Sequence, residues 1–373
     1  MSTQAIPTAA VPAPLPGAQR LTDSHGRAIT DLRVSVTDRC NYRCVYCRTG
    51  NDGAQYSELP LADYLRIIRV FVSLGIEKVR LTGGEPLLRR DLTALIREIA
   101  QLRTSYAPDG TPLDDSDGRT GVRDGSDYSG GSGSLDIAVT TNGHLLASQA
   151  QSLRDAGLTR VTVSMDAVDP EVFSRITRVP GSYDRVLAGV RAAQAAGLGP
   201  VKVNCVLLRG FNDDQIVPFV DFARTEGVIL RFIEFMPLEE DRIWSPDTVI
   251  GYDELKARIG AVRPLVPLQS NAPGETAQRF TFDDGIGEIG IIAPVSRAFC
   301  GACSRVRLTS DGKIRTCLFS QTDHDLYGVL HRGGTDDDLA AYIRNVIAQK
   351  EARHHIGEPG FLKPSRSMVH IGG

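Results

Sequence analysis

Between about residues 31 and 236, short runs of β-branched and apolar residues alternate with longer stretches in which apolar residues recur at helical spacing. Short apolar runs are typical of buried strands, and the longer stretches are typical of amphipathic helices. Their regular alternation indicates repeated βα units around a parallel sheet. The pattern predicts strands at residues 32–36, 78–82, 136–140, 160–165, 201–208 and 229–235.

The intervening helices are predicted from their apolar faces, most clearly at residues 62–74 and 215–225. In the first of these, Leu65, Ile68 and Val72 share one face of a helix. Six βα units are too few to close an eight-stranded barrel. We therefore predict an α/β fold, an open (βα)6 three-quarter barrel of the TIM type, with its chemistry on loops at the C-terminal ends of the strands.

The alternation of strand and helix patterns is interrupted at several places, which divide the chain into regions. Residues 1–30 are expected to form a flexible N-terminal tail, and residues 31–236 the partial barrel. Within the barrel, residues 104–135 are dominated by Gly, Ser and Asp and predict a disordered insertion, because so few apolar residues cannot offset the entropy of ordering. Residues 237–362 form a C-terminal α+β extension, and residues 363–373 a basic tail ending in Gly-Gly. The extension has strand candidates at 278–282, 286–292, 305–309 and 313–315, and a helix candidate at 336–352.

The composition limits the classes of partner that can be expected and indicates a cellular compartment. A net charge of −3 over 373 residues gives no basic field that would attract nucleic acid or an anionic membrane. The first 18 residues contain no apolar run near the ~20 residues that a membrane span needs. Seven cysteines in a long chain argue against a disulfide framework and favour a reducing cytoplasm. Only Cys205 falls outside two sets of three, and it is expected to be a buried strand residue.

The first set of cysteines lies directly after the first predicted strand. Cys40, Cys44 and Cys47 have the spacing C-x₃-C-x₂-C, which places three thiolates on one loop and suits an iron–sulfur cluster in which one iron has no protein ligand. A structural zinc site is the alternative, but zinc takes four ligands and no fourth lies near Cys40. The paired glycines Gly83 and Gly84 follow the second predicted strand, where they allow close approach of the backbone.

The second set has the spacing C-x₂-C-x₁₃-C and consists of Cys300, Cys303 and Cys317. Again there are three thiolates and no obvious fourth, which favours a second cluster with an open iron. A zinc ribbon stays open as an alternative, with His324 as the nearest candidate ligand. Arg305 and Arg307 lie two apart on a predicted strand, so both guanidiniums point to one face, where they can bind phosphate.

The first triplet together with the sequence Gly83-Gly84-Glu85-Pro86 resembles the radical S-adenosylmethionine (SAM) enzymes. The resemblance implies that one 4Fe-4S cluster is held by Cys40, Cys44 and Cys47 and that SAM chelates its open iron. It also implies a set of SAM-binding positions, namely Tyr46, Gly84, Ser164 and Met236. Without the resemblance, Ser164 is a strand-end hydroxyl and Met236 a packing residue.

The stretches 31–40 and 299–318 and the terminal Gly372-Gly373 resemble a narrower family, the GTP 3′,8-cyclases of molybdenum cofactor biosynthesis (the MoaA family). This resemblance implies a second 4Fe-4S cluster on Cys300, Cys303 and Cys317 that holds the guanine edge. It implies that GTP is bound by Arg33, Arg80, Thr140, Lys202, Arg305 and Arg307. It further implies that the Gly372-Gly373 tail reaches the active site and helps to position a catalytic arginine. Arg48-Thr49 depart from the family, which commonly has Met-Pro there, and the insertion 104–135 has no family counterpart.

The implied reaction converts GTP to 3′,8-cyclo-7,8-dihydro-GTP, with a lyase class, a cytoplasmic location and a possible homodimer. The implied partners are an electron donor protein and a downstream cyclic pyranopterin monophosphate synthase. Two alternatives stay open. One is a radical SAM peptide-modifying enzyme with an auxiliary cluster, which typically carries more than three extra cysteines; the other is a non-enzymatic iron–sulfur or zinc protein.

Overall fold

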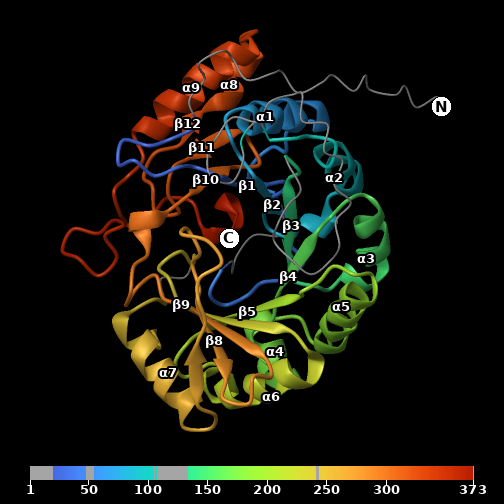
Figure 1. The fold of residues 1–373 in the computed structure, drawn as a ribbon, viewed down its shortest axis with the longest axis vertical. Coiled ribbons are helices and arrows are strands. Elements are labelled where there is room, and N and C mark those ends of the chain that lie inside the picture. Colours follow the sequence, from blue (N-terminus) through green and yellow to red (C-terminus); the bar gives the residue numbers. More distant parts are fainter. Residues whose placement is uncertain (1–19, 48–53, 105, 107–132, 241–242, 373) are drawn as a thin grey trace.

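A computed structural model describes residues 20–47, 54–104, 106, 133–240 and 243–372. The strands form one sheet curved into an open ring, with most helices on its outside (Figure 1). The strand order is β12-β11-β10-β1-β2-β3-β4-β5-β6-β9-β8-β7, and the run from β10 to β9 is parallel throughout. No pairing between β12 and β7 closes the ring in the described residues.

The predicted strands correspond closely to β1–β6. They are β1 (Asp31–Ser35), β2 (Lys78–Thr82), β3 (Asp136–Thr141), β4 (Arg160–Ser164), β5 (Lys202–Leu207) and β6 (Ile229–Glu234). The remaining strands are β7 (Leu265–Pro267), β8 (Gln278–Phe282), β9 (Glu288–Ile292), β10 (Arg305–Leu308), β11 (Lys313–Arg315) and β12 (His324–Asp325). The open α/β barrel predicted from the sequence is therefore confirmed.

The C-terminal extension joins this barrel more intimately than its sequence indicated. β10 pairs in parallel with β1, and β9 pairs in parallel with β6, so the extension lengthens the same sheet at both edges. β8, β7, β11 and β12 then add antiparallel edges. Local periodicity could not reveal this arrangement, because the partners of β9 and β10 are remote in sequence and no βα unit connects them.

The helices follow the expected amphipathic pattern. In α1 (Leu61–Ser73) the buried side chains include Leu65, Ile68 and Val72, as predicted. The barrel helices are completed by α2 (Leu92–Ile99), α3 (Leu146–Asp155), α4 (Pro170–Thr177), α5 (Tyr183–Ala195) and α6 (Ile216–Glu226). The extension contributes α7 (Tyr252–Gly260), α8 (Leu326–His331), α9 (Asp336–Ala348) and α10 (Met368–Ile371). Short 3-10 turns are η1 (Pro86–Leu88), η2 (Asp213–Gln215), η3 (Pro246–Thr248) and η4 (Cys300–Ala302).

The expectation of a flexible tail over residues 1–30 is wrong for its second part. Residues 20–30 fold back on themselves through a bridge between Thr22 and Ala28, and Leu21 and Ile29 are buried. The amide of Leu21 donates a hydrogen bond to the carbonyl of Leu74, at the end of α1, over 2.9 Å. Leu21 and Ile29, the two apolar residues that flank the polar turn, anchor this segment. Two such residues are too short a sequence pattern to predict the packing. Residues 1–19 lie outside the described part of the chain.

The predicted disordered insertion 104–135 is likewise wrong at its ends. The Thr104 amide donates to the Gly133 carbonyl over 2.8 Å, Arg103 pairs with Ser134, and Tyr106 is buried. The rest of the insertion, residues 105 and 107–132, lies outside the described residues, as do Arg48 and Thr49. The two ends of the insertion are therefore paired with each other, at residues 103–104 and 133–134.

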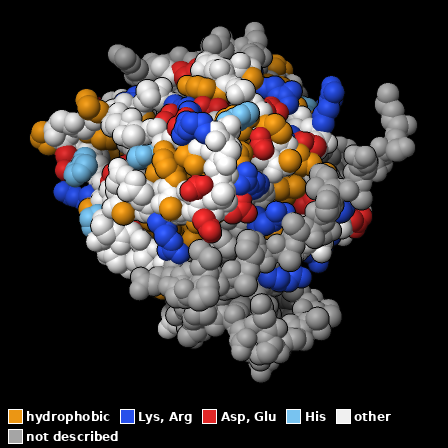
Figure 2. All heavy atoms as spheres, turned by 90° about the horizontal axis from the view of Figure 1, so that it is seen from above, with side chains coloured by type: hydrophobic (Ala, Val, Ile, Leu, Met, Phe, Trp, Pro, Cys, Tyr) orange, Lys and Arg blue, Asp and Glu red, His pale blue; other side chains and the backbone are white. Residues whose placement is uncertain are grey.

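Figure 2 shows the molecule from the side of α8 and α9, where Lys, Arg, Asp and Glu side chains are interspersed and form no broad basic face. In the described part of the chain, none of the helices is both long and apolar enough to cross a membrane. Several arginines, among them Arg33, Arg80 and Arg307, lie instead inside the barrel.

Candidate active site

A cavity of about 2140 Å³ runs through the barrel. Single small-molecule sites are typically ~300–1000 Å³, so this cavity has room for more than one ligand. Its wall includes Arg33, Cys40, Cys44, Tyr46, Cys47, Arg80, Gly84, Thr140, Ser164, Lys202, Met236, Cys300, Cys303, Arg305, Arg307 and Cys317. The structure thus brings both cysteine triplets and all other predicted site residues, apart from the terminal glycines, to one space.

The first triplet lies on the loop that leaves β1. The Tyr42 amide donates to Cys40 Sγ over 3.4 Å, and the Cys47 amide donates to the Cys44 carbonyl over 3.0 Å. Burial, and then the carboxylate of Asp166, raise the pKa of the Cys44 thiol well above its usual value. Three soft sulfur donors turned into one cavity suit an iron–sulfur cluster, in which each thiolate binds a different iron.

Gly83 and Gly84 press directly against this loop. A Cβ atom on Gly83 would lie 2.1 Å from the Thr37 carbonyl oxygen, and one on Gly84 would lie 2.2 Å from that of Arg39. The Gly84 amide also donates to the Thr37 carbonyl over 2.8 Å, and Gly83 has a φ of +138°. Only glycine fits here, so the close backbone approach predicted from the sequence is confirmed. One partner of that approach is the loop that carries Cys40.

Tyr46 is fixed by a residue that the sequence analysis left without a role. Its hydroxyl donates to Asp166 Oδ2 over 2.7 Å, while Asp166 Oδ1 accepts from the Val206 amide over 2.9 Å. Burial raises the pKa of Asp166 to about 6. Asp166 therefore links the first cysteine loop to the ends of β4 and β5. The sequence signal was its place just after Ser164, at the C-terminal end of a predicted strand.

The second triplet is assembled from two separate segments. Cys300 and Cys303 lie at η4, and Cys317 follows β11. Arg305 Nη2 donates to Cys303 Sγ over 3.4 Å. Burial would raise the pKa of the Cys303 thiol, but Arg305 and Lys350 outweigh it and the pKa falls to about 6. These contacts favour a thiolate at Cys303, the form that binds iron.

The zinc alternative finds no support in the placement of possible ligands. His324 lies on β12, where it pairs with Ile314 of β11, and it is not part of the cavity wall. Across the described ranges, no group of three His, Cys, Asp or Glu side chains is placed to hold a single metal ion. A four-iron cluster has a different requirement, because its ligand sulfurs bind separate irons and stay apart.

Three arginines form a row across neighbouring strands. Arg307 of β10 is in register with Arg33 of β1, which is in register with Arg80 of β2. Burial, and then Arg307, lower the pKa of Arg33 well below its usual value, and burial lowers the pKa of Arg307 to about 10. Like charges side by side on one face of a sheet are destabilising. An anion bound beside this row would offset the repulsion.

A second cationic group continues the wall on β5 and β6. Burial, and then Arg231, lower the pKa of Lys202 to about 7. Burial, and then Arg80, lower the pKa of Arg231 to about 10. Arg231 was not singled out in the sequence, although it occupies an inward position on a predicted strand. Arg80 Nη1 donates to Thr140 Oγ1 over 3.2 Å, so Thr140 helps to aim one of these arginines.

The C-terminal tail enters the barrel. Arg307 Nη1 donates to the Ile371 carbonyl over 3.3 Å and also to the Gly372 carbonyl. Gly372 has a φ of +71°, and a Cβ atom there would lie 2.6 Å from Thr82 Cγ2. The position thus requires glycine for its conformation and its surroundings. Gly373 lies outside the described residues.

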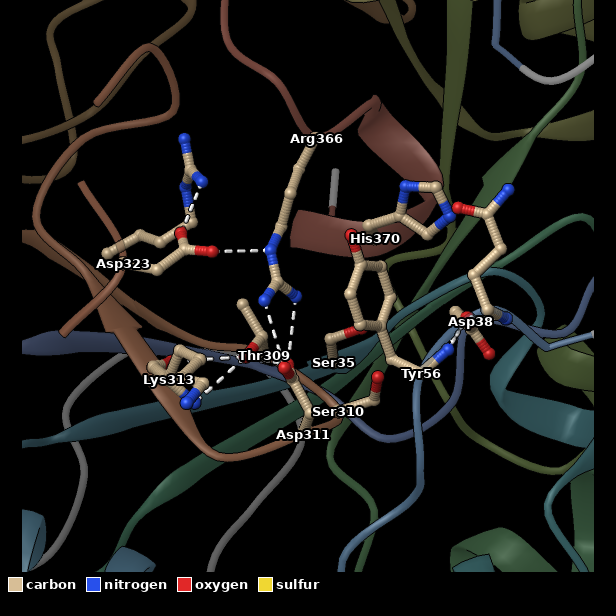
Figure 3. A network of polar contacts seen from close by, with 12 residues as sticks. Ser35, Asp38, Tyr56, Thr309, Ser310, Asp311, Lys313, Asp323, Arg366 and His370 are labelled. Atoms are coloured by element: carbon tan, nitrogen blue, oxygen red, sulfur yellow. Dashed lines mark hydrogen bonds and ion pairs between the residues drawn. The ribbon is translucent and has the colours of Figure 1, made fainter. Parts of the chain in front are cut away.

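Arg366 anchors this tail, as Figure 3 shows. Its Nη1 and Nη2 donate to the two carboxylate oxygens of Asp311 over 2.8 and 2.9 Å, and its Nε donates to Asp323 over 2.5 Å. The guanidinium lies 4.0 Å from the ring centroid of Tyr56, whose ring in turn meets that of His370 edge-on. The sequence analysis missed this anchor, because it joins residues from three distant segments.

Two family models match successive parts of the chain. The Radical SAM superfamily matches residues 34–223, which contain the end of β1, the strands β2–β5 and the first triplet. The Molybdenum Cofactor Synthesis C family matches residues 228–356, which contain the second triplet.

Individual relatives and a solved structure match most of the chain. A protein of Xanthomonas axonopodis pv. citri named GTP 3′,8-cyclase is 43% identical over 330 residues, covering 87% of this chain and 90% of its own. One of the same name from Syntrophomonas wolfei is 38% identical, covering 95% of this chain and 100% of its own. The crystal structure of Streptococcus suis SuiB bound to S-adenosylmethionine has a TM-score of 0.53 at 15% identity, covering 88% of this chain and 68% of that one, a likeness of fold. The chain therefore belongs to the radical SAM superfamily and, within it, to the GTP 3′,8-cyclase family.

Proposed function

We propose that this protein is a radical SAM lyase that converts GTP to 3′,8-cyclo-7,8-dihydro-GTP, the first step of molybdenum cofactor biosynthesis. The observation that carries the proposal is that one cavity is lined by a SAM-type cysteine triplet, a second triplet and a row of arginines that lie in register on neighbouring strands. In this proposal the arginines bind the triphosphate of GTP. Its relatives of the same name extend over most of the chain.

The first triplet and its neighbours prepare SAM. The cofactors are SAM and an iron–sulfur cluster, and the cluster on Cys40, Cys44 and Cys47 supplies, when bound, one electron for the reductive cleavage of SAM. Tyr46, oriented by Asp166, bounds the SAM site on one side. Gly84, Ser164 and Met236 complete that site from the ends of β2, β4 and β6. Together they hold SAM beside the ribose of GTP and exclude water.

The second triplet is proposed to hold a second 4Fe-4S cluster, against which the guanine edge is placed. Its support is the donor set of Cys300, Cys303 and Cys317, the hydrogen bond from Arg305 to Cys303, and the placement of all three on the cavity wall. Three protein ligands leave one iron open to a nitrogen or oxygen of the base.

The remaining polar residues are proposed to orient the nucleotide. Arg33, Arg80 and Arg305 bind phosphate oxygens, and Lys202 and Thr140 complete that pocket. Arg307 differs from these residues in its hydrogen bonds, because its Nη1 already donates to the carbonyls of Ile371 and Gly372. The tail thereby turns the rest of its guanidinium toward the reacting part of GTP. Gly372 and Gly373 act through Arg307 in this proposal.

The wider setting follows from the same chemistry. A reductive enzyme with oxygen-sensitive thiolates works in a reducing compartment, so we place it in the cytoplasm with an electron donor protein as its partner. In this proposal the product passes to a cyclic pyranopterin monophosphate synthase, and the chain forms a homodimer.

The decisive experiment is anaerobic reconstitution followed by incubation with SAM, GTP and a strong reductant. We expect 5′-deoxyadenosine, methionine and the cyclised nucleotide, each detected by liquid chromatography with mass spectrometry. Replacing GTP by ATP serves as the control, because it keeps the triphosphate and changes the base. A reconstituted protein that cleaves SAM but leaves GTP unchanged would overturn the proposal.

A further inference from the structure

Arg27, in the N-terminal segment that the sequence analysis expected to be flexible, reaches the second triplet. Its Nη1 donates to the carbonyls of Cys300 and Ala352 over 2.9 and 2.8 Å, and its Nη2 donates to that of Glu351 over 2.6 Å. Its Nε pairs with Asp23 over 2.6 Å. Arg27 is only 8% exposed. One buried guanidinium therefore ties the start of the chain to the first cysteine of the triplet and to the segment after α9.

Lys350 lies next to this contact, two residues beyond the end of α9, and it holds the main chain near the other two cysteines. Its Nζ donates to the carbonyl of Arg305 over 3.0 Å and to that of Thr316. Arg305 is two residues beyond Cys303, and Thr316 immediately precedes Cys317. Lys350 is 3% exposed. Arg27 and Lys350 together thus fix the main chain beside each of the three cysteines.

The hydrogen bonds of Arg27 and Lys350 stabilise both the buried cations and the main chain around them. Taking a cation out of water is unfavourable unless its hydrogen bonds are replaced, and here main-chain carbonyls supply most of the replacements. Each such carbonyl is thereby held at a fixed point, whereas a neutral side chain would hold it less firmly. A cluster whose three thiolates come from two separate segments gains most from such fixing, because nothing in the local sequence brings Cys317 to Cys300 and Cys303.

We infer that Arg27 and Lys350 are positioning residues for the second cysteine triplet, which can take up its cluster only when both are in place. This inference rests on the proposed second cluster. It assigns to residues 20–30 a role in assembling a site that lies at the other end of the chain. The first triplet needs neither residue, since its cysteines share one loop.

The test compares iron content after anaerobic reconstitution in the full chain. Wild type is expected to bind about eight irons, and Arg27→Ala and Lys350→Met about four each. Both variants should still cleave SAM, which shows that the barrel and the first cluster are intact. Arg20→Ala is the matched control, because Arg20 lies in the same segment but pairs with Glu77 instead, and it should retain about eight irons.

The outcomes separate the inference from the proposal beneath it. If wild type and a Cys300→Ala, Cys303→Ala, Cys317→Ala variant both bind about four irons, the second cluster itself is wrong. If wild type, Arg27→Ala and Lys350→Met all bind about eight, the positioning role is wrong. If the alanine variant fails to fold, Arg27→Lys serves in its place, because it keeps a buried cation but lacks the several N–H donors of the guanidinium. It should lose the second cluster to a chelator at least tenfold faster than wild type, and an unchanged rate would refute the inference.

Discussion

The two cysteine triplets present the same three ligands but are built in opposite ways. Cys40, Cys44 and Cys47 share one loop after β1, held by its own hydrogen bonds and by the glycine pair after β2. The second triplet is spread over residues 300–317, with β10 and β11 between its members. Its backbone is fixed by cations at residues 27 and 350.

The difference shows which site depends on the rest of the molecule. A ligand set on one loop is disturbed chiefly by changes in that loop and its immediate neighbours. A set that depends on remote contacts responds to substitutions in many segments. Changes in the tail, the N-terminal segment or α9 are therefore expected to affect GTP chemistry while leaving SAM cleavage in place. The predictions below test that separation.

The largest effect is expected from removing one triplet at a time. Replacing Cys300, Cys303 and Cys317 by alanine should lower the iron content from about eight to about four and abolish cyclisation, with SAM cleavage retained. Replacing Cys40, Cys44 and Cys47 should abolish both reactions. Iron analysis and product chromatography measure these outcomes. The comparison breaks if loss of the second triplet also stops SAM cleavage.

Deleting Gly372 and Gly373 comes next. Without the Gly372 carbonyl, Arg307 loses one of the two tail carbonyls that orient it, so cyclisation should be lost while both clusters and GTP binding remain. Cyclisation assays and iron analysis of the truncated protein test this. A peptide of the final residues, added back, should restore part of the activity. Cyclisation at the wild-type rate would mean that the tail is only a chain end.

Arg366→Ala should have a smaller effect of the same kind. It removes charge-assisted hydrogen bonds to Asp311 and Asp323, and the loss of even one such bond, worth ~1.5–3 kcal/mol, should weaken docking of the tail by roughly 10- to 150-fold. Cyclisation should fall and the KM for SAM stay unchanged in steady-state assays. Arg353→Ala is the matched control, because its pair with Glu358 is exposed and worth little. Equal rates for the two variants would contradict the role of the anchor.

The smallest expected effect is the uptake of protons by Lys202 when GTP binds. In the free protein the pKa of Lys202 is about 7, lowered by burial and then by Arg231, so at pH 8 its amine is mostly neutral. A bound triphosphate favours the charged amine and raises this pKa, so GTP binding at pH 8 should take up a fraction of a proton. At pH 6 the amine is already mostly protonated, so this uptake should be much smaller. Calorimetry in buffers of different ionisation enthalpy measures it, with Lys202→Met as the control that subtracts the protons of GTP itself.

Much of this protein was determined by local sequence. Hydrophobic period predicted β1–β6 and their order, because each βα unit buries its own apolar face against its neighbours. The first triplet and the glycines 83 and 84 could be placed for the same reason, since their partners lie at adjacent strand ends. The arginine spacing of β10 likewise placed Arg305 and Arg307 on one face.

Only the tertiary structure decided the rest. The parallel pairing of β9 and β10 with the barrel edges, the packing of residues 20–30 and the anchor at Arg366 all join segments that are remote in the chain. Such contacts depend on hydrogen-bond geometry and charge in three dimensions, and composition leaves no trace of them. Arg27 is the sharpest case: in sequence it is one basic residue in a polar turn, and in the fold it holds the first cysteine of the second triplet.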